Sequence, residues 1–214
     1  MILYKTIKKE AIAEQIIDKS KFITHVCPVN SREEADAFIK KIKTEHKGAT
    51  HNVPAMVIGE NFQIQWASDD GEPQGTSGAP IVQMLVNEGI TNVAVVVTRY
   101  FGGIKLGTGG LVRAYTSSAK LGIEAGEVCD VKEMTSIDVK MDYSYLSIFQ
   151  NLAKSQPFEI GDIKYEEKIT IKFLTEPENV ASIREHVAGV TSGTAIVLEE
   201  KTDTIKVKKS LKNY

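Results

Sequence analysis

The stretch RYFGGIKLGTGGLVRAY, from Arg99 to Tyr115, decides the fold around it. It directly follows the apolar run 93–97 and contains five glycines, three cations and no acid. A continuous β-branched run is typical of a strand buried on both faces. Glycine is costly inside ordinary helices and strands, so this density predicts special backbone angles or the close approach of another group.

A second glycine-rich stretch lies earlier in the chain. SDDGEPQGTSGAP, residues 68–80, carries three acids and no cation. Nine of the chain's sixteen glycines lie between positions 71 and 110. We therefore expect the functional site in these two loops, of which one is acidic and the other basic.

Length and composition indicate a globular protein of one or two domains. The 214 residues are 42% hydrophobic and 25% charged, close to the average of soluble domains, and the formal net charge is −2. So small a net charge supplies no global field for nucleic acid or an anionic membrane, and such a partner would need a local patch. The two cysteines are far apart and in no CxxC motif, so no disulfide, metal or other cofactor is expected.

The sequence shows no secretion signal and no membrane segment. Residues 1–21 are charged throughout, and no apolar run approaches the ~18–20 residues that span a bilayer. Together with two unpaired thiols, this predicts a cytoplasmic protein without a membrane partner. The sequence leaves the oligomeric state open.

Periodicity predicts an N-terminal α+β domain over residues 1–130. Ser31 followed by Glu34 predicts a capping box that begins a helix, and Gly48 is placed to end that helix in a left-handed conformation. Trp66, in an expected strand, is assigned to the core. The expected strands are 21–29, 51–58, 62–68 and 93–98, and the expected helices begin near 31, 80 and 110.

A second domain is expected over residues 135–205. Its expected strands are 137–141, 158–165, 169–174 and 194–199, and its helices are 143–154 and 179–187. The order β-α-β-β-α-β is the ferredoxin-like, split βαβ arrangement. Loss of periodicity at 127–133 predicts the boundary, and the basic residues of 206–214 predict a solvated, frayed tail.

The basic loop is a candidate cradle for an anion. Its candidate residues are Arg99, Gly102, Gly103, Lys105, Gly107, Thr108, Gly109, Gly110 and Arg113. Free N–H groups and the dipole at a helix start attract negative charge, and the three cations add charge-assisted bonds to phosphate or carboxylate. The spacing matches neither a Walker A motif nor GxGxxG. The alternative is a tight strand-to-helix connection whose glycines serve packing alone.

The acidic loop and one histidine are further candidates. Asp69, Asp70 and Glu72 carry the oxygen ligands of a hard cation such as Mg²⁺, or paired carboxylates for acid–base chemistry. The alternative is an Asp-Gly turn with solvated charges, followed by a hydroxyl side chain that caps the next helix. His51 begins an expected strand and is either a general base or a structural histidine.

Tyr100 and Phe101 are the candidates for stacking on a nucleic-acid base. They lie between cations in a glycine-flanked loop, as aromatic side chains do in single-strand-binding proteins. His25 and His186 belong to no visible constellation, and His46, near a helix end, is assigned to the helix dipole.

At these two loops the chain resembles the IMPACT/YigZ family. The matching residues are Lys47-x-Ala49-x-His51, SDDGEPQGTSGAPI from Ser68, and VVTRYFGGIKLGTGGLVRAY from Val96. The resemblance covers about residues 1–130, and the remainder is similar to the additional C-terminal domain of the bacterial members. It implies an N-terminal domain like the second domain of a small-subunit ribosomal protein, and a C-terminal domain like the last domain of elongation factor G.

Two hypotheses about function follow. The first is a cytoplasmic regulator of translation or of a stress response that binds RNA or the ribosome; the family has no established catalytic residues, and a protein partner is a further expectation. The second is an enzyme or small-ligand-binding protein that acts on a phosphorylated or carboxylated metabolite at the glycine-rich loops. The second hypothesis requires that the acidic and basic loops meet in space.

Overall fold

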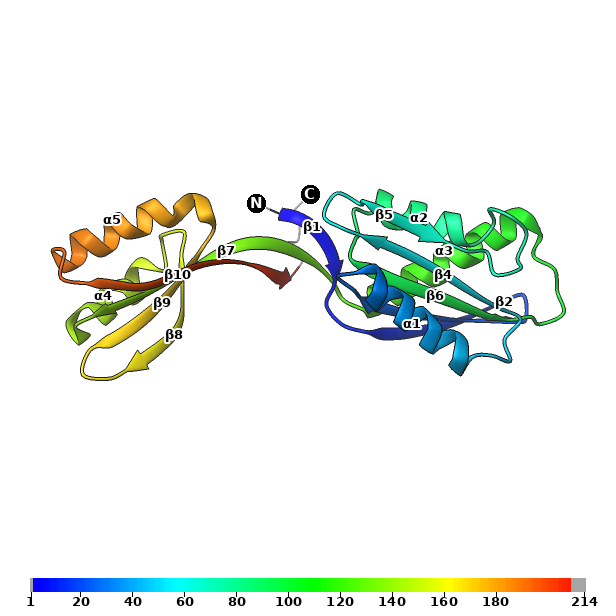
Figure 1. Ribbon diagram of the computed structural model, residues 1–214, viewed down its shortest axis with the longest axis horizontal. Coiled ribbons are helices and arrows are strands. Elements are labelled where there is room, and N and C mark those ends of the chain that lie inside the picture. The colour runs from blue at the N-terminus through cyan, green and yellow to red at the C-terminus, as the bar shows by residue number, and fades with distance from the viewer. Residues whose placement is uncertain (1, 209–214) are drawn as a thin grey trace. The chain divides into compact units, whose positions relative to one another are not determined.

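The computed structural model describes residues 2–208, and the chain divides into two compact units. One unit contains Tyr4–Asp130, and the other contains Val131–Lys206 with the first residues of the chain. Each unit has antiparallel strands, helices and a buried apolar core of its own, so the predicted α+β class is confirmed (Figure 1).

The N-terminal unit is built on a five-stranded antiparallel sheet with the order β2-β3-β6-β4-β5. Its strands are β2 (Ala11–Ile17), β3 (Ser20–Pro28), β4 (His51–Ile58), β5 (Ile64–Ala67) and β6 (Val93–Tyr100). The valines of β6 are buried without exception, as expected for a central strand that is covered on both faces. β2 and β5 lie at the two edges.

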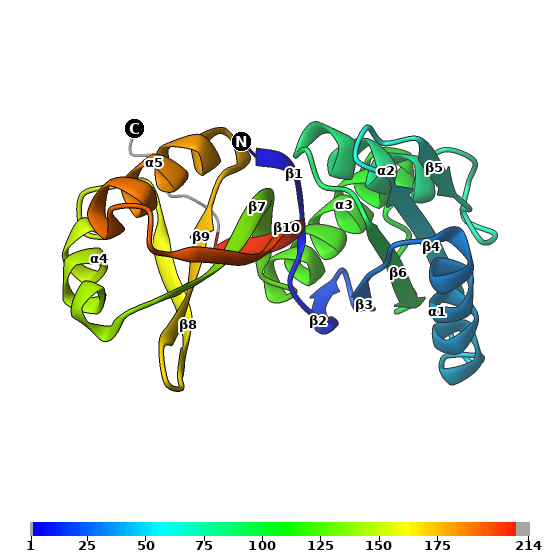
Figure 2. The same ribbon diagram turned by 60° about the vertical axis from the view of Figure 1, so that its left-hand side comes forward.

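Helices cover both faces of this sheet (Figures 1 and 2). α1 (Arg32–Glu45) places its apolar side against Met56, Ala94 and Val96 on one face. α2 (Gly78–Asn87) and α3 (Gly107–Ala125) pack on the opposite face against alternate residues of the same strands, such as Val53 and Val95. Successive side chains of β4 and β6 thus point into two separate cores, one on each face of the sheet.

Two predictions about helix ends are wrong in detail. Ser31 caps α1 as expected, since its hydroxyl accepts a hydrogen bond from the Glu34 N–H, but the helix ends at Glu45, and Gly48 is not among the glycines with positive φ. α3 begins at Gly107 and not near Gly110, so its glycines form the first helical turn. The sequence reasoning also missed β2, which forms a tight hairpin with the following strand β3, and β1 (Ile2–Ile7), which pairs with the distant β7.

The C-terminal unit has the predicted element order. Its elements are β7 (Val128–Met141), a 3₁₀ turn (Tyr143–Tyr145), α4 (Leu146–Leu152), β8 (Glu159–Tyr165), β9 (Ile169–Thr175), a second 3₁₀ turn (Pro177–Asn179), α5 (Val180–Thr191) and β10 (Ile196–Lys208). The sheet order is β1-β7-β9-β8, and β10 pairs with β7. The core includes Phe149, Phe158 and Phe173, whose rings meet edge to face.

Two further predictions need correction. The strand expected over 137–141 already begins at Val128, so residues 128–133 lie in β7, while the chain divides between Asp130 and Val131, inside the predicted boundary segment 127–133. β10 continues to Lys208, so residues 206–208 of the expected frayed tail lie in a strand, whereas 209–214 lie outside the described residues. Within residues 2–208, no helix is long and apolar enough to cross a membrane.

Candidate functional site

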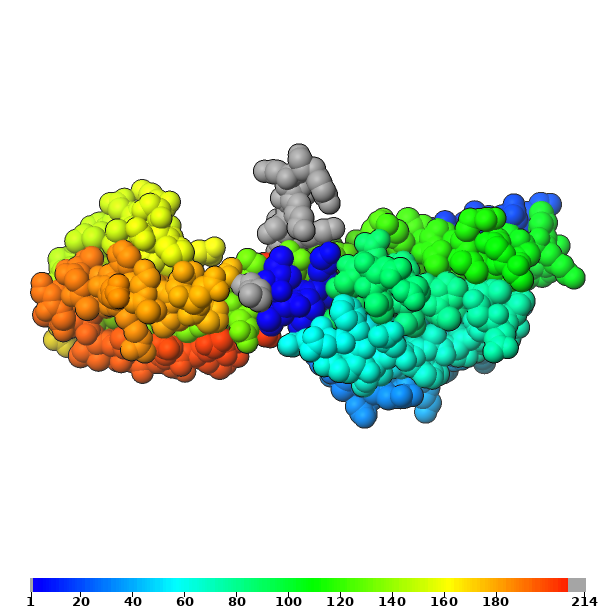
Figure 3. Space-filling model, turned by 90° about the horizontal axis from the view of Figure 1, so that it is seen from above, coloured from blue at the N-terminus to red at the C-terminus, as the bar shows by residue number. Residues whose placement is uncertain are grey.

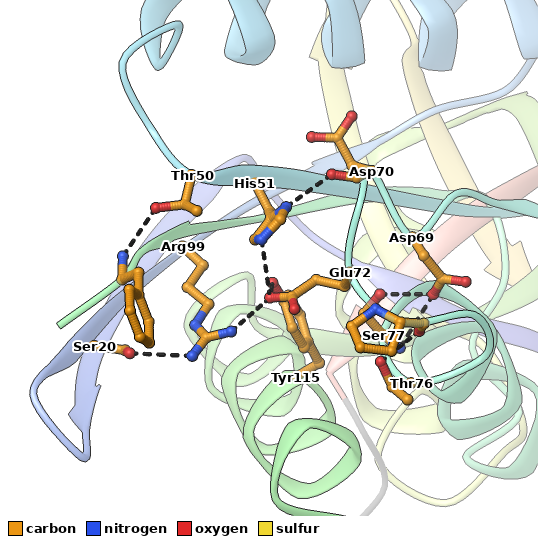
Figure 4. Close-up of polar contacts among 12 residues, drawn as sticks. Ser20, Thr50, His51, Asp69, Asp70, Glu72, Thr76, Ser77, Arg99 and Tyr115 are labelled. Carbon is orange, nitrogen blue, oxygen red and sulfur yellow. Dashed lines mark hydrogen bonds and ion pairs between the residues drawn. The ribbon is translucent and has the colours of Figure 1, made fainter. Parts of the chain in front are cut away.

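The centre of the candidate site is the buried carboxylate of Glu72, in the acidic loop between β5 and α2. Its Oε1 accepts hydrogen bonds from Arg99 Nη1 of β6 and from Tyr115 Oη of α3, each at 2.7 Å (Figure 4). The side chains of Glu72 and Arg99 are only 4% and 6% exposed. Burial, followed by the bond to Glu72, raises the pKa of Tyr115, so the phenol is a permanent donor. The acidic loop therefore meets the end of β6.

Arg99 is held on several sides. Its Nη2 donates to Ser20 Oγ at 3.2 Å, and its guanidinium lies over the rings of Phe22 and Phe101, 5.4 and 5.3 Å from their centroids. These contacts and the Glu72 pair offset part of the cost of burying the cation, while its buried Nε has no hydrogen-bond partner among the described residues. Arg99 therefore presents no free guanidinium to solvent. Its contacts instead hold Glu72, Ser20 and Phe101 in place.

His51 lies beside this cluster with one nitrogen fixed. Its Nδ1 is 2.9 Å from the carbonyl oxygen of Asp70, which can only accept, so Nδ1 carries a proton. Its Nε2 faces Glu72 Oε1 at 3.7 Å, and the side chain is 19% exposed. Figure 4 shows the imidazole between the Asp70 backbone and Glu72. A histidine with a fixed tautomer and partial solvent access can exchange a proton with a bound molecule.

Asp69 is a helix cap. Its Oδ1 accepts from the N–H and hydroxyl of Ser77 and from the Gly78 N–H, and its Oδ2 accepts from the Gly75 N–H. Burial alone would raise the pKa of Asp69, but these hydrogen bonds outweigh burial and lower it. The expected hydroxyl cap at the start of α2 is thus replaced by a carboxylate, because Ser77 makes no side-chain cap.

Asp70 points elsewhere. Its Oδ1 forms an ion pair with Lys43 Nζ at 2.6 Å, and its Oδ2 accepts from the Asn52 N–H at 2.6 Å. The three acids of the loop therefore serve three separate purposes. No cluster of three His, Cys, Asp or Glu side chains suited to a metal ion occurs among residues 2–208, so the loop geometry gives no support to the Mg²⁺ interpretation.

The basic loop is pinned at its start and open beyond it. Gly102 donates its N–H to Ser20 Oγ at 3.2 Å, and a Cβ at this position would overlap the Lys19 carbonyl group of the β2–β3 turn. Gly103 and Gly107 have φ of +90° and +71°, which favour glycine. The Phe101 N–H donates to Thr50 Oγ1 at 3.0 Å.

The start of α3 has no side-chain cap, and its first turn is Gly107, Thr108, Gly109 and Gly110. Arg113 folds back over this turn, because its Nη1 lies 3.8 Å from the position of a Cβ on Gly109. Lys105 and Arg113 are exposed, and their side chains form no ion pair or hydrogen bond with any residue the structure describes. Phe101 is 45% exposed.

Tyr100 belongs to a constellation that the sequence reasoning missed. Its hydroxyl lies 3.0 Å from His46 Nδ1, and His46 Nε2 lies 3.0 Å from His25 Nε2. Burial, and then the neighbouring His46, lower the pKa of His25. His25, on β3, and His46, after α1, are far apart in sequence, so only the packing of the helix on the sheet brings them together.

Tyr115, Ser20 and Phe22 are the other site residues that the sequence reasoning missed. Tyr115 is the last residue of the opening stretch, and its place on the inner side of α3 was the only available indication. Ser20 carries no motif, because it reaches Arg99 through the pairing of β3 with β6.

Known proteins match both parts of the chain. Residues 18–123 match the model of the Impact N-terminal domain, and residues 139–194 match a domain of unknown function, DUF1949. The chain is 40% identical to IMPACT family member YvyE of Bacillus subtilis, over 92% of this chain and 90% of the relative. It is 31% identical to IMPACT family member YigZ of Escherichia coli, over 85% and 90% of the two chains.

A solved structure supports the same assignment. The crystal structure of a hypothetical protein, 29% identical, covers 91% of this chain and 96% of its own, with a TM-score of 0.58. Fold and site together define an α+β protein of two units with a buried Glu–Arg–Tyr cluster under its glycine-rich loops. The chain belongs to the IMPACT family.

Proposed function

We propose that this protein is a non-catalytic cytoplasmic regulator of translation or of a stress response, and that it binds RNA, free or on the ribosome, through the basic loop and the start of α3. The observation that carries the proposal is the set of exposed groups there: the unpaired side chains of Lys105 and Arg113, the half-exposed ring of Phe101 and a helix start without a side-chain cap. Cations and helix N–H groups bind phosphate, and an exposed ring stacks on a base.

The local character of this patch fits a chain without net positive charge. Gly103 and Gly107 let the backbone approach a ligand closely. Arg99, Glu72 and Tyr115 are buried and linked by hydrogen bonds, so they restrain the start of the basic loop. The expected likeness of the two units to a ribosomal-protein domain and to the last domain of elongation factor G supports a role in translation by fold analogy.

The test is a titration of single-stranded and structured RNA at several salt concentrations. The variant Lys105→Ala/Arg113→Ala is expected to weaken binding and to reduce the slope of log K against log salt by about one for each lost phosphate contact. Lys40→Ala/Lys41→Ala, which removes two exposed lysines of α1 in the same unit, is the matched control. Equal, salt-insensitive curves for all three proteins would refute RNA binding at this patch.

The position of His51 favours a second candidate function, a site for a phosphorylated or carboxylated metabolite. His51 Nε2 and Glu72 Oε1 face each other at 3.7 Å, and only the histidine reaches solvent. We propose this as the alternative to RNA binding. A thermal-shift screen of phosphate esters and carboxylates tests it, since a ligand at 100 times its Kd stabilises a protein by about 2.7 kcal/mol. A shift that persists in His51→Gln, or no shift with any compound, contradicts it.

A further inference from the structure

The N-terminal sheet has a free edge at β5, which pairs with β4 alone. The Ser68 N–H donates to the Pro54 carbonyl at 3.2 Å, and bonded pairs alternate along an antiparallel ladder. Trp66 therefore directs its backbone groups toward β4, whereas Gln65 and Ala67 direct theirs away from the sheet. No hydrogen bond from a described residue takes up these outward groups. Such an unpaired edge is a template for another strand.

A groove runs along this edge. It has a volume of about 390 Å³, with Gln65, Trp66 and Ala67 of β5 on one wall and Ala79, Val82 and Gln83 of α2 on the other. The surfaces of β5 and α2 adjoin in the space-filling view, in the cyan and blue-green of residues 64–87 (Figure 3).

The start of α2 lies very close to the end of β5. A Cβ on Gly78, the first residue of α2, would lie 2.8 Å from the Ser68 carbonyl oxygen. Glycine at this position thus allows the helix to begin directly beside the strand.

Trp66 is exposed beside the groove, contrary to its assignment to the core. It is 37% exposed, and the Arg32 guanidinium lies 5.9 Å from its ring centroid. Large aromatic side chains that remain exposed at a concave surface are typical anchors of protein interfaces. Trp66 is also the only tryptophan in the chain, so its fluorescence reports on the surroundings of this sheet edge.

The charge of the groove selects its occupant. α2 contains no acidic or basic residue, and the one charged residue of the lining, Asp69, uses both of its oxygens to cap α2. A phosphate backbone finds no cation on these walls, whereas an uncharged strand finds main-chain partners on β5 and apolar contacts on Val82 and Trp66. Charge and hydrogen-bond complementarity therefore favour a peptide segment over nucleic acid.

We propose that the groove between β5 and α2 binds an extended, uncharged segment of a partner protein, which adds a sixth strand to the five-stranded sheet. Main-chain bonds to Gln65 and Ala67 supply affinity. Successive side chains of the added strand point to opposite faces, toward Val82 on the α2 side and toward Trp66 on the α1 side, and supply selectivity. This docking site is independent of the RNA-binding patch proposed above.

The first experiment selects linear peptides from a displayed random library on the full-length protein and measures the best synthetic peptide by Trp66 fluorescence. We expect alternating apolar residues and at least a tenfold loss of affinity in Gln83→Arg, which places an exposed cation on the groove wall. Gln150→Arg, the same change at an exposed position of the C-terminal unit, is expected to bind like the wild type. Peptides that bind both variants equally would overturn the proposal.

The second experiment follows amide hydrogen exchange. In the free protein the amides of Gln65 and Ala67 are expected to exchange fast and that of Trp66 slowly, and the bound peptide should protect the first two. N-methylation of alternate peptide residues removes either the N–H groups that face β5 or those that face solvent. Only the first of these two patterns should abolish binding. Two outcomes would contradict strand addition at β5. One is protection from exchange that is confined to other parts of the protein. The other is slower exchange of the Gln65 and Ala67 amides with single-stranded RNA but not with peptide.

Discussion

Glu72 Oε1 lies 2.7 Å from Arg99 Nη1, and this contact joins the acidic loop to the end of the central strand β6, just before the basic loop. Both side chains are buried, so neither charge is compensated by water. The pair fixes the position of the acidic loop relative to the start of the basic loop. Loss of either partner leaves a buried, unpaired charge.

Glu72→Gln is expected to destabilise the protein by about 3–5 kcal/mol, because it leaves the Arg99 cation buried without a counter-charge. Urea unfolding followed by circular dichroism measures the effect. Glu60→Gln, at an exposed turn position, is the matched control and should change stability by less than about 0.5 kcal/mol. Equal midpoints for the two variants would show that the pair contributes little.

Tyr115→Phe removes one hydroxyl donor to Glu72 and keeps the ring that packs edge to face on Phe22. The expected cost is about 1–3 kcal/mol, since the hydroxyl is buried and its acceptor is charged. Tyr143→Phe removes an exposed hydroxyl that donates to the Glu166 carbonyl, and it should cost distinctly less. Chemical denaturation measures the loss of stability in both variants. A larger loss in Tyr143→Phe than in Tyr115→Phe would be incompatible with the buried cluster.

Gly102→Ala should destabilise by about 1–3 kcal/mol, because the added Cβ overlaps the backbone of Lys19 and Ser20 and must push the β2–β3 turn away. Gly48→Ala is the control: its φ is not positive, and no atom lies within 4 Å of the added Cβ. Thermal unfolding compares the two. A Gly102→Ala protein as stable as Gly48→Ala would show that the loop start is not pinned.

The stability of the N-terminal unit should fall in mild acid because of His25. Its folded-state pKa lies below the ordinary value of 6.5, for which burial and then His46 are the main causes, with Lys41 and Glu45 of α1 also acting on it. Between the folded and unfolded pKa values the unfolded chain binds more protons, so stability is full above pH 6.5 and decreases as the pH falls through this window.

His25→Gln should flatten the pH dependence of the unfolding free energy in that window, whereas His186→Gln, a change in the C-terminal unit, should leave it unaltered. Urea titrations at a series of pH values measure the slope. An unchanged slope in His25→Gln would contradict a role of the His25–His46 contact.

Local physical rules made several elements predictable. The bounds expected for β4 are those observed, and the β-branched run of β6 is buried on both faces, because apolar alternation and continuity depend on neighbours in the sequence. Ser31 caps α1 for the same local reason. Gly48 and the start of α3 differ from expectation because glycine permits several backbone conformations, and the surrounding packing selects one.

The sequence by itself determined the α+β class, the element order of the C-terminal unit and the two loops at which a site should be sought. Only the tertiary structure decided what the residues of those loops do. Three neighbouring acids became a helix cap, a lysine partner and the buried partner of Arg99, because hydrogen-bond partners are chosen by three-dimensional proximity. For the same reason Arg99 lies inside the molecule, Lys105 and Arg113 lie at its surface, and Trp66 borders an open sheet edge that no local pattern predicts.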